Sequence, residues 1–214
     1  MLDKLSLVTQ GRSDPNQNTR QKLVILEPSC GHGQIIQTIL NKECSFLGDL
    51  LQRYDTITIV AIDLDPRAID ECRRQNDILG GPSSIGSTGK DSHHSRISIV
   101  FDCHNFLETR RENYIHDPSS VVVSVGGPPY GTDPASRDLP MKLVRHCMRE
   151  WKSIVIAFLV PQRLSTKISE EDELVGAYAF QGEELADSTF FFKGETAVTQ
   201  PSRLHCWYRS SDTS

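Results

Sequence analysis

The fold is decided by one stretch near the start of the chain, Leu23-Val-Ile-Leu-Glu-Pro-Ser-Cys-Gly-His-Gly33. Four apolar residues, typical of a buried strand, lead to the acidic residue Glu27 and then to a turn that contains Gly31 and Gly33. Glycines in such a turn let the backbone approach a ligand where a side chain would block it. Glycine turns are common between strands and helices, so the rest of the chain has to supply the context.

Further along the chain, four more short apolar runs rich in β-branched residues have the same buried-strand character: Ile57 to Ile62, Ile97 to Phe101, Val121 to Val125 and Ile154 to Val160. Segments with helical periodicity lie between them, with their apolar residues on one face: Ile35, Ile36, Ile39 and Leu40; Ala68, Ile69 and Cys72; Met141, Val144, Met148 and Trp151. Two later runs, Phe190 to Lys193 and Leu204 to Arg209, are expected to close the far edge of the sheet. We therefore predict a doubly wound α/β fold with a mainly parallel seven-stranded sheet and helices on both faces.

The domain organisation is predicted from composition along the chain. Residues 1–21 are polar and are expected to form an arm, residues 22–209 a single domain, and residues 210–214 a tail. Residues 78–96 are so rich in Gly and Ser that they are predicted to be a flexible loop insertion. Residues 163–188 are predicted to hold an acidic helical segment around Glu170 to Glu173.

Composition limits the class of protein. With 37% hydrophobic and 24% charged residues, the chain has the composition of a soluble protein, and no apolar run is long enough to cross a bilayer. No secretory signal is recognisable, so we expect an intracellular protein, cytoplasmic or nuclear. The six cysteines lack metal-ligand spacing, which predicts reduced thiols and no metal site. The net charge of −5 weakens the case for a nucleic-acid substrate but does not exclude it.

Two of the later predicted strands also end in a carboxylate. Asp63 follows the second strand, and in doubly wound folds an acidic group at this place accepts hydrogen bonds from ribose hydroxyls. The alternative is that Asp65 and Pro66 cap the next helix and Asp63 belongs only to the turn. Asp102 follows the third strand and could accept from the amine of an adenine, with a backbone contact near Cys103. The alternative for Asp102 is a solvated loop residue.

The most informative stretch is Val121-Val-Val-Ser-Val-Gly-Gly-Pro-Pro-Tyr-Gly-Thr132. Two prolines after an apolar strand remove further backbone donors and fix a rigid turn with outward carbonyls. Tyr130 would be held beside those carbonyls. This arrangement predicts a preorganised hydrogen-bond acceptor next to a flat ring. A simple strand terminator, or a decoy that only resembles a polyproline-binding motif, is the alternative.

In this order, these segments resemble the class I S-adenosylmethionine-dependent methyltransferases, over residues 22 to 163. Glu27-Pro-Ser-Cys-Gly-His-Gly33 is similar to the cofactor loop of that family, and Asp63 and Asp102 are similar to its ribose-side and adenine-side acids. Gly127-Pro-Pro-Tyr130 resembles the Asn/Asp-Pro-Pro-Tyr/Phe signature of members that methylate a planar nitrogen. Val160-Pro-Gln-Arg163 is also similar to that group.

The resemblance implies S-adenosylmethionine as the cofactor and a set of site residues. The implied cofactor-binding residues are Glu27, Pro28, Ser29, Gly31, Gly33, Asp63, Leu64, Asp102 and Cys103. The implied catalytic residues are Gly127, Pro128, Pro129 and Tyr130, and the implied substrate contacts are Tyr130, Gly131 and Arg163. One departure matters: Gly127 stands where the family has Asn, Asp or Ser, so the side-chain acceptor is absent and backbone carbonyls remain.

Three functions are compatible with this pattern. The first is methylation of an exocyclic amine of a nucleic-acid base, adenine N6 in RNA or DNA, with RNA ahead of DNA; the second is methylation of a protein amide of the glutamine type. The third is a weak or inactive subunit that partners an active enzyme. Lys142, Arg145, His146 and Arg149 share a helix face that is either a phosphate-contacting stripe or a solvated surface. The negative charge of the acidic run Glu170 to Glu173 would repel the phosphate backbone of a nucleic acid. An RNA substrate would therefore be recognised through a protein partner or by its shape.

Overall fold

The computed structural model describes residues 21–41, 45–78, 96–129, 138–161, 177–185, 189–192, 196–199 and 202–210. Tyr130, Gly131 and Arg163 lie outside these residues. The same is true of residues 1–20, of the Gly- and Ser-rich residues 79–95, and of most of the segment predicted as an acidic helix.

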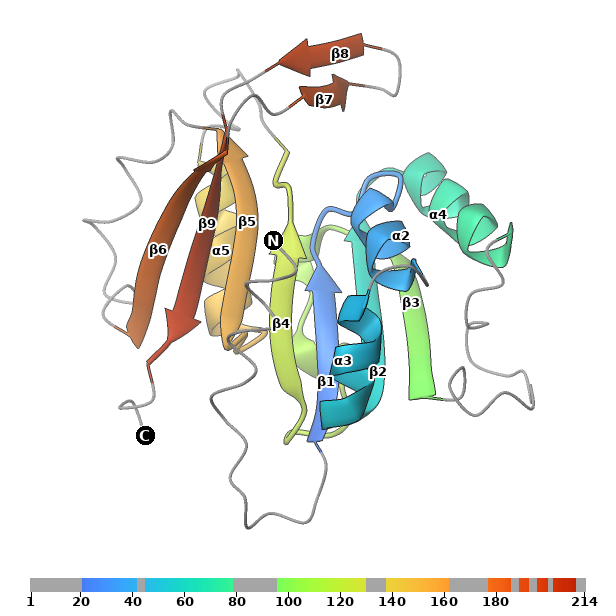
Figure 1. Cartoon of the computed structure of the whole chain (residues 1–214), viewed down its shortest axis with the longest axis vertical. Helices are drawn as coiled ribbons and strands as arrows, with labels where there is room; N and C mark the ends of the chain where they lie inside the picture. The colour runs from blue at the N-terminus through green and yellow to red at the C-terminus, as the bar shows by residue number, and fades with distance from the viewer. Residues whose placement is uncertain are drawn as a thin grey trace.

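The centre of the molecule is a seven-stranded sheet with the strand order β3-β2-β1-β4-β5-β9-β6 (Figure 1). In that order the strands are Ile97–Cys103, Tyr54–Asp63, Gln21–Glu27, Val121–Gly126, Val155–Pro161, Ser202–Arg209 and Tyr178–Leu185. Strands β1 to β5 are parallel, and β9 runs antiparallel to both β5 and β6. The predicted mainly parallel sheet is confirmed, and the carboxyl ends of β1 to β5 therefore meet at one edge.

Helices cover both faces of this sheet (Figure 1). The helices α2 (Gln34–Leu40), α3 (Ser45–Arg53) and α4 (Pro66–Ile78) pack on one face. The helix α5 (Leu139–Arg149) and the 3-10 helix η3 (Phe106–Glu108) pack on the other, next to a second 3-10 helix, η4 (Arg111–Asn113). Among these described residues, no helix is both long enough and apolar enough to cross a membrane.

The apolar runs are continuous because the parallel strands are buried on both faces. In β1, Leu23 and Ile25 belong to the core under α2 and α3, whereas Val24 and Leu26 belong to the core under α5. Successive side chains of a strand point to opposite faces, so a strand covered on both sides needs apolar residues at every position. This burial explains why the five parallel strands could be found from sequence.

The far edge of the sheet differs from the prediction. Strand β9 was expected and forms, but it lies between β5 and β6 and is not the edge strand. Strand β6 was not predicted, and it pairs along its whole length with β9. The acidic helix predicted around Glu170 to Glu173 lies outside the described residues. Strand β7 (Thr189–Phe192) does not join the main sheet and instead pairs with β8 (Thr196–Thr199). Helix α3 was not predicted either, although Phe46 and Leu50, one turn apart, are buried against the sheet.

Candidate active site

The carboxyl ends of β1 to β4 bring several predicted site residues together. The Gly31 amide donates to Asp63 Oδ2 at 2.8 Å, which joins the loop after β1 to the end of β2. The Ser29 hydroxyl donates to the Gly127 carbonyl at 3.4 Å, which joins the same loop to the turn after β4. Cys103 Sγ lies 3.7 Å from the Leu64 carbonyl and joins β3 to β2. Residues from four separate segments thus form one band along the edge of the sheet.

Glycine is present at two positions after β1 for different structural reasons. Both adopt left-handed backbone conformations, with φ of 51° at Gly31 and 77° at Gly33. A Cβ at Gly33 would lie 2.8 Å from Cys72 Sγ on α4, so this glycine is required by packing as well as by conformation. A Cβ at Gly31 would meet no atom of the described residues within 4 Å. Gly31 is therefore the position at which the backbone is open to a ligand.

Asp63 braces the loops around it and keeps acceptor capacity. Its Oδ2 accepts from the Gly31 amide and its Oδ1 accepts from the Asp65 amide at 2.9 Å. An ionised carboxylate has about four lone-pair sites, so two remain for a ligand. The predicted helix cap is confirmed, because Asp65 Oδ1 accepts from the Arg67 amide at 2.9 Å and α4 begins at Pro66.

An apolar side chain and a second carboxylate flank Asp63. The Leu64 side chain is 72% exposed although it is apolar. Asp102 is half-buried at the end of β3, and its Oδ2 accepts a hydrogen bond from the Tyr114 hydroxyl. Burial and this hydrogen bond raise the pKa of Tyr114. Tyr114 therefore orients Asp102, a role that nothing in the local sequence around Tyr114 could have indicated.

Glu27 ends β1 beneath the loop and is almost fully buried. Its side chain is 3% exposed, and its Oε2 has no hydrogen-bond partner among the described residues. Burial raises its pKa well above the ordinary value, and the nearby Cys72 and Asp63 raise it further. A buried acceptor without a partner is uncommon in proteins and is the kind of group that a donor on a ligand would satisfy.

The turn after β4 is packed at its first glycine and open at its second. A Cβ at Gly126 would touch Pro28 Cδ at 3.6 Å and the Phe158 ring at 3.7 Å, so the start of the turn is packed. Among the described residues, no atom would lie within 4 Å of a Cβ at Gly127, and Gly127 is exposed. The following Pro128 is buried. The turn thus has a fixed base and free space at its first exposed residue.

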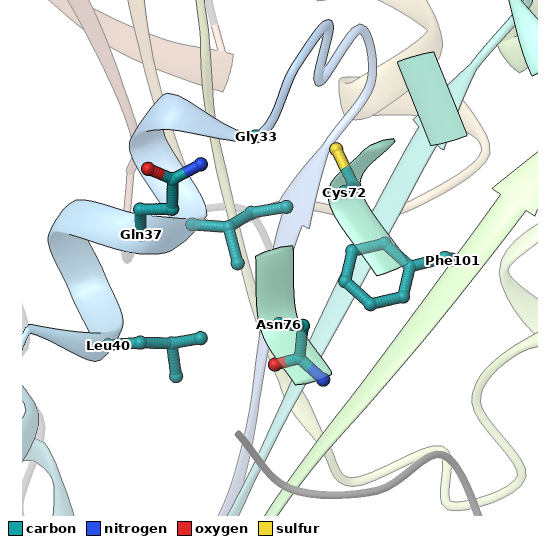
Figure 2. Close-up of a pocket in the computed structure, with 7 residues that line it drawn as sticks. Gly33, Gln37, Leu40, Cys72, Asn76 and Phe101 are labelled. Atoms are coloured by element: carbon teal, nitrogen blue, oxygen red, sulfur yellow. The ribbon is translucent and has the colours of Figure 1, made fainter. Parts of the chain in front are cut away.

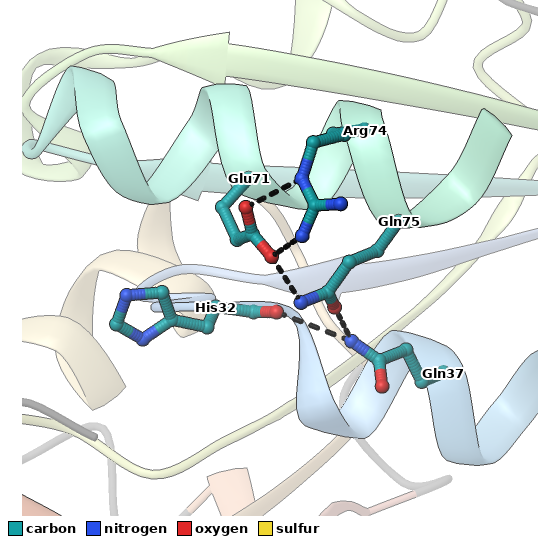
Figure 3. Close-up of polar contacts among 5 residues, drawn as sticks. All are labelled: His32, Gln37, Glu71, Arg74 and Gln75. Atoms are coloured by element: carbon teal, nitrogen blue, oxygen red, sulfur yellow. Dashed lines mark hydrogen bonds and ion pairs between the residues drawn. The ribbon is translucent and has the colours of Figure 1, made fainter. Parts of the chain in front are cut away.

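Polar contacts between α2 and α4 support the glycine loop from outside (Figure 3). Gln37 Nε2 donates to the His32 carbonyl at 3.3 Å and also to Gln75 Oε1. Gln75 Nε2 donates in turn to Glu71 Oε1 at 2.6 Å. Hydrogen bonds from Arg74 and then from Gln75 lower the pKa of Glu71 to about 2. These contacts connect the loop to the exposed sides of both helices.

A small pocket lies between α2, α4 and β3, away from the band. It is lined by Gly33, Ile36, Gln37, Leu40, Cys72, Asn76 and Phe101 (Figure 2). Its interior has room for about one water molecule. Its lining is mostly apolar and shares only Gly33 with the predicted site residues, so we attribute it to imperfect packing and not to ligand binding.

The predicted basic face of α5 needs one correction. His146 is half-buried, and its Nε2 lies 2.9 Å from the Thr109 carbonyl. Its ring also packs edge-on against Phe106, with centroids 4.8 Å apart. Burial lowers the pKa of His146, so the ring is part of the packing under α5 and does not belong to a phosphate-contacting stripe. Lys142 and Arg149 are exposed.

Comparisons with known proteins place the fold. No protein-family model matches the sequence, and a comparison with curated protein sequences finds no match. Among solved structures, a protein from Listeria monocytogenes assigned to the class I S-adenosylmethionine-dependent methyltransferases is similar, with a TM-score of 0.55 and 15% identity over 100% of this chain and 60% of the other. A small RNA methyltransferase is similar with a TM-score of 0.55 and 10% identity, over 100% of this chain and 26% of that one. A protein from Clostridium thermocellum assigned as an rRNA methylase has a TM-score of 0.51 and 11% identity, over 98% and 95% of the two chains.

These likenesses concern the fold. The predicted Rossmann-like methyltransferase fold is confirmed by the seven-stranded sheet and by the similar structures. At identities of 10 to 15%, they do not assign roles to individual residues.

Proposed function

We propose that this chain is an S-adenosylmethionine-dependent N-methyltransferase that acts on an exocyclic amine of a nucleic-acid base, with adenine N6 in RNA as the first candidate. The observation that carries the proposal is the pair of contacts from the loop after β1, Gly31 to Asp63 and Ser29 to Gly127. Together they put the predicted cofactor loop beside both the ribose-side acid and the Gly-Pro-Pro turn, at the ligand edge of a methyltransferase fold.

The residues present suit the cofactor. S-adenosylmethionine, when bound, supplies a methyl group activated by a positively charged sulfur. The free lone pairs of Asp63 would accept from ribose hydroxyls, and the exposed Leu64 side chain would pack against the adenine ring. The Asp102 oxygen not used by Tyr114 would accept from the adenine amine. Glu27 Oε2 offers a buried acceptor below the loop.

The turn after β4 suits a planar amine. The carbonyls of Gly127 and Pro128 would accept hydrogen bonds from the substrate amine, and the proline-fixed turn would hold these acceptors in place. Transfer of a methyl group needs the nitrogen and the methyl carbon in near-attack geometry, so positioning is the main task of these residues. We favour RNA over DNA as the substrate. Two similar structures support this choice, because their names describe an rRNA methylase and a small RNA methyltransferase.

The cofactor part of the proposal is tested by calorimetric titration of S-adenosylhomocysteine into the whole chain. We expect saturable binding that weakens at least tenfold in Asp63→Ala, because the carboxylate both contacts the ribose and braces the loop. Leu64→Ser is a second variant. Because the Leu64 side chain is exposed, this substitution should leave the chain folded, and it should weaken S-adenosylhomocysteine binding severalfold. Asp70→Ala removes an exposed carboxylate on α4 and serves as the control. Absence of binding by the unmodified chain would refute the proposal.

The substrate part is tested by transfer of a labelled methyl group to RNA, DNA and protein fractions. Activity on RNA that falls steeply with salt is expected, because phosphate contacts release counterions. Activity confined to protein, with flat salt dependence, would instead support methylation of a protein amide.

A second candidate function rests on Gly127. Because the side-chain acceptor of related enzymes is absent there, the chain could serve as a weak or inactive subunit that partners an active methyltransferase. Loss of one preorganised hydrogen-bonding group can lower a rate about 100-fold. Gly127→Asn tests this candidate: a gain in methyl transfer indicates a weakened enzyme, whereas transfer that stays undetectable in both proteins favours the partner role.

A further inference from the structure

The Ser29 hydroxyl lies against the backbone carbonyl of Gly127. We propose that Ser29, which comes from the loop after β1, supplies the side-chain hydrogen-bond acceptor that Gly127 lacks, and that Ser29 is a catalytic residue in contact with the substrate amine. The inference rests on the proposed function and names a residue of the same site. The family resemblance implies only a cofactor role for Ser29, because the turn after β4 is far from it along the chain.

The hydrogen bond between the two segments sets the direction of the hydroxyl. Ser29 donates its only proton to the Gly127 carbonyl over 3.4 Å. Among the described residues, the hydroxyl has no other hydrogen-bond partner, so its two lone pairs are available as acceptors. A donor that approaches Gly127 from the exposed side would meet these lone pairs next to the Gly127 carbonyl.

The position of Ser29 is fixed from both sides. The preceding Pro28 is buried and lies against Gly126 at the base of the turn. The following Cys30 donates its amide to the Ile62 carbonyl at 3.0 Å. Strands β1 and β4 are hydrogen-bonded neighbours, with Leu26 opposite Ser124 just before the two turns. A hydroxyl held between such fixed points is preorganised, which is what an acceptor needs to stabilise developing charge.

The chemistry requires an acceptor and no net proton transfer to Ser29. One N–H of the amine would donate to Ser29 Oγ while the Ser29 hydroxyl donates to Gly127. The nitrogen lone pair forms the bond to the methyl carbon, the carbon–sulfur bond breaks, and its electron pair stays on sulfur. The extra proton on nitrogen then leaves to water. Ser29 accepts a hydrogen bond that strengthens as the nitrogen becomes positive, and it keeps its own proton throughout.

The test compares two ligands by calorimetry: S-adenosylhomocysteine, and a bisubstrate analogue in which the N6 of adenosine is linked to the cofactor at the sulfur position. The unmodified chain should bind the analogue more tightly than S-adenosylhomocysteine. Ser29→Ala should weaken analogue binding about threefold to tenfold, as expected for one hydrogen bond, and change S-adenosylhomocysteine binding less than about twofold. Ser29→Thr should retain the preference. Ser98→Ala, which removes a hydroxyl at the amino end of β3, is the matched control.

A second part of the test uses position 127, where the methyltransferases that the sequence resembles carry a side-chain acceptor. In Gly127→Asn the added carboxamide offers its own acceptor, so Ser29→Ala should then cost less than about twofold in analogue affinity. Equal weakening of both ligands by Ser29→Ala would overturn the inference and leave Ser29 as a cofactor ligand. Equal affinity of the unmodified chain for both ligands would also overturn it, while the cofactor part of the proposed function would stand. No binding of S-adenosylhomocysteine at all would overturn the proposed function, and the inference with it.

Discussion

Two glycine turns lie side by side at the edge of the sheet, and they differ in why glycine is present. In the turn after β1, Gly31 and Gly33 have positive φ, and Gly33 has no room for a Cβ beside Cys72. In the turn after β4, Gly127 has an ordinary φ and open space around it. The first turn needs glycine for its backbone and packing. The second has room for a Cβ among the described residues, so neither backbone conformation nor packing there requires glycine at position 127.

The largest effect is expected at Gly33. Gly33→Ala combines a left-handed conformation that costs about 1–2 kcal/mol with a clash against Cys72 that costs about 1–3 kcal/mol. We therefore expect the free energy of unfolding to fall by about 2–5 kcal/mol in chemical denaturation. The double variant with Cys72→Ala should remove the clash, so that only the cost of the left-handed conformation at residue 33 remains. A loss of less than about 1 kcal/mol in the single variant would contradict the packing argument.

A smaller effect on stability is expected when the pH is changed. It should arise from Glu27, which precedes the turn after β1, and not from the turn after β4. The pKa of the buried Glu27 is raised, so between its ordinary value of 4.5 and its folded value the folded state holds one more proton than the unfolded state. Stability must then fall as pH rises through this window, by up to about 1.4 kcal/mol per pH unit.

Glu27→Gln isolates this term because it keeps the shape and removes the ionisation. Denaturation of both proteins at a series of pH values from about 5 to 7 should show Glu27→Gln gaining stability over the unmodified chain as pH rises. The matching position at the end of β4 is Gly126, which has no group to titrate. A pH-independent difference between the two proteins would show that Glu27 is not buried as described.

The smallest effect is expected at Gly127. Gly127→Ala should leave the free energy of unfolding unchanged, or raise it by up to about 0.5 kcal/mol, because the new methyl group meets no atom of the described residues and the unfolded chain loses freedom. Denaturation alongside Gly33→Ala makes the contrast direct. A loss of more than about 1 kcal/mol would mean that the turn after β4 is as constrained as its neighbour.

Prediction from sequence succeeded where burial leaves a periodic trace. The five parallel strands are covered on both faces, so each appears as a continuous apolar run. It failed for α3, and it failed for β6, whose pattern becomes meaningful only when β9 lies beside it. At the site, Asp63 could be placed because it ends a strand. Tyr114 could not, because its contact with Asp102 depends on how the segment after β3 folds back.

The sequence by itself determined which residues lie at the ends of the parallel strands, because strand and turn signals are local. Tertiary structure alone decided which of those ends are neighbours. Ser29 and Gly127 are 98 residues apart and meet only because β4 adds to the side of β1 opposite β2. That choice follows from how the crossover connections pack helices on the two faces of the sheet, which no single segment encodes.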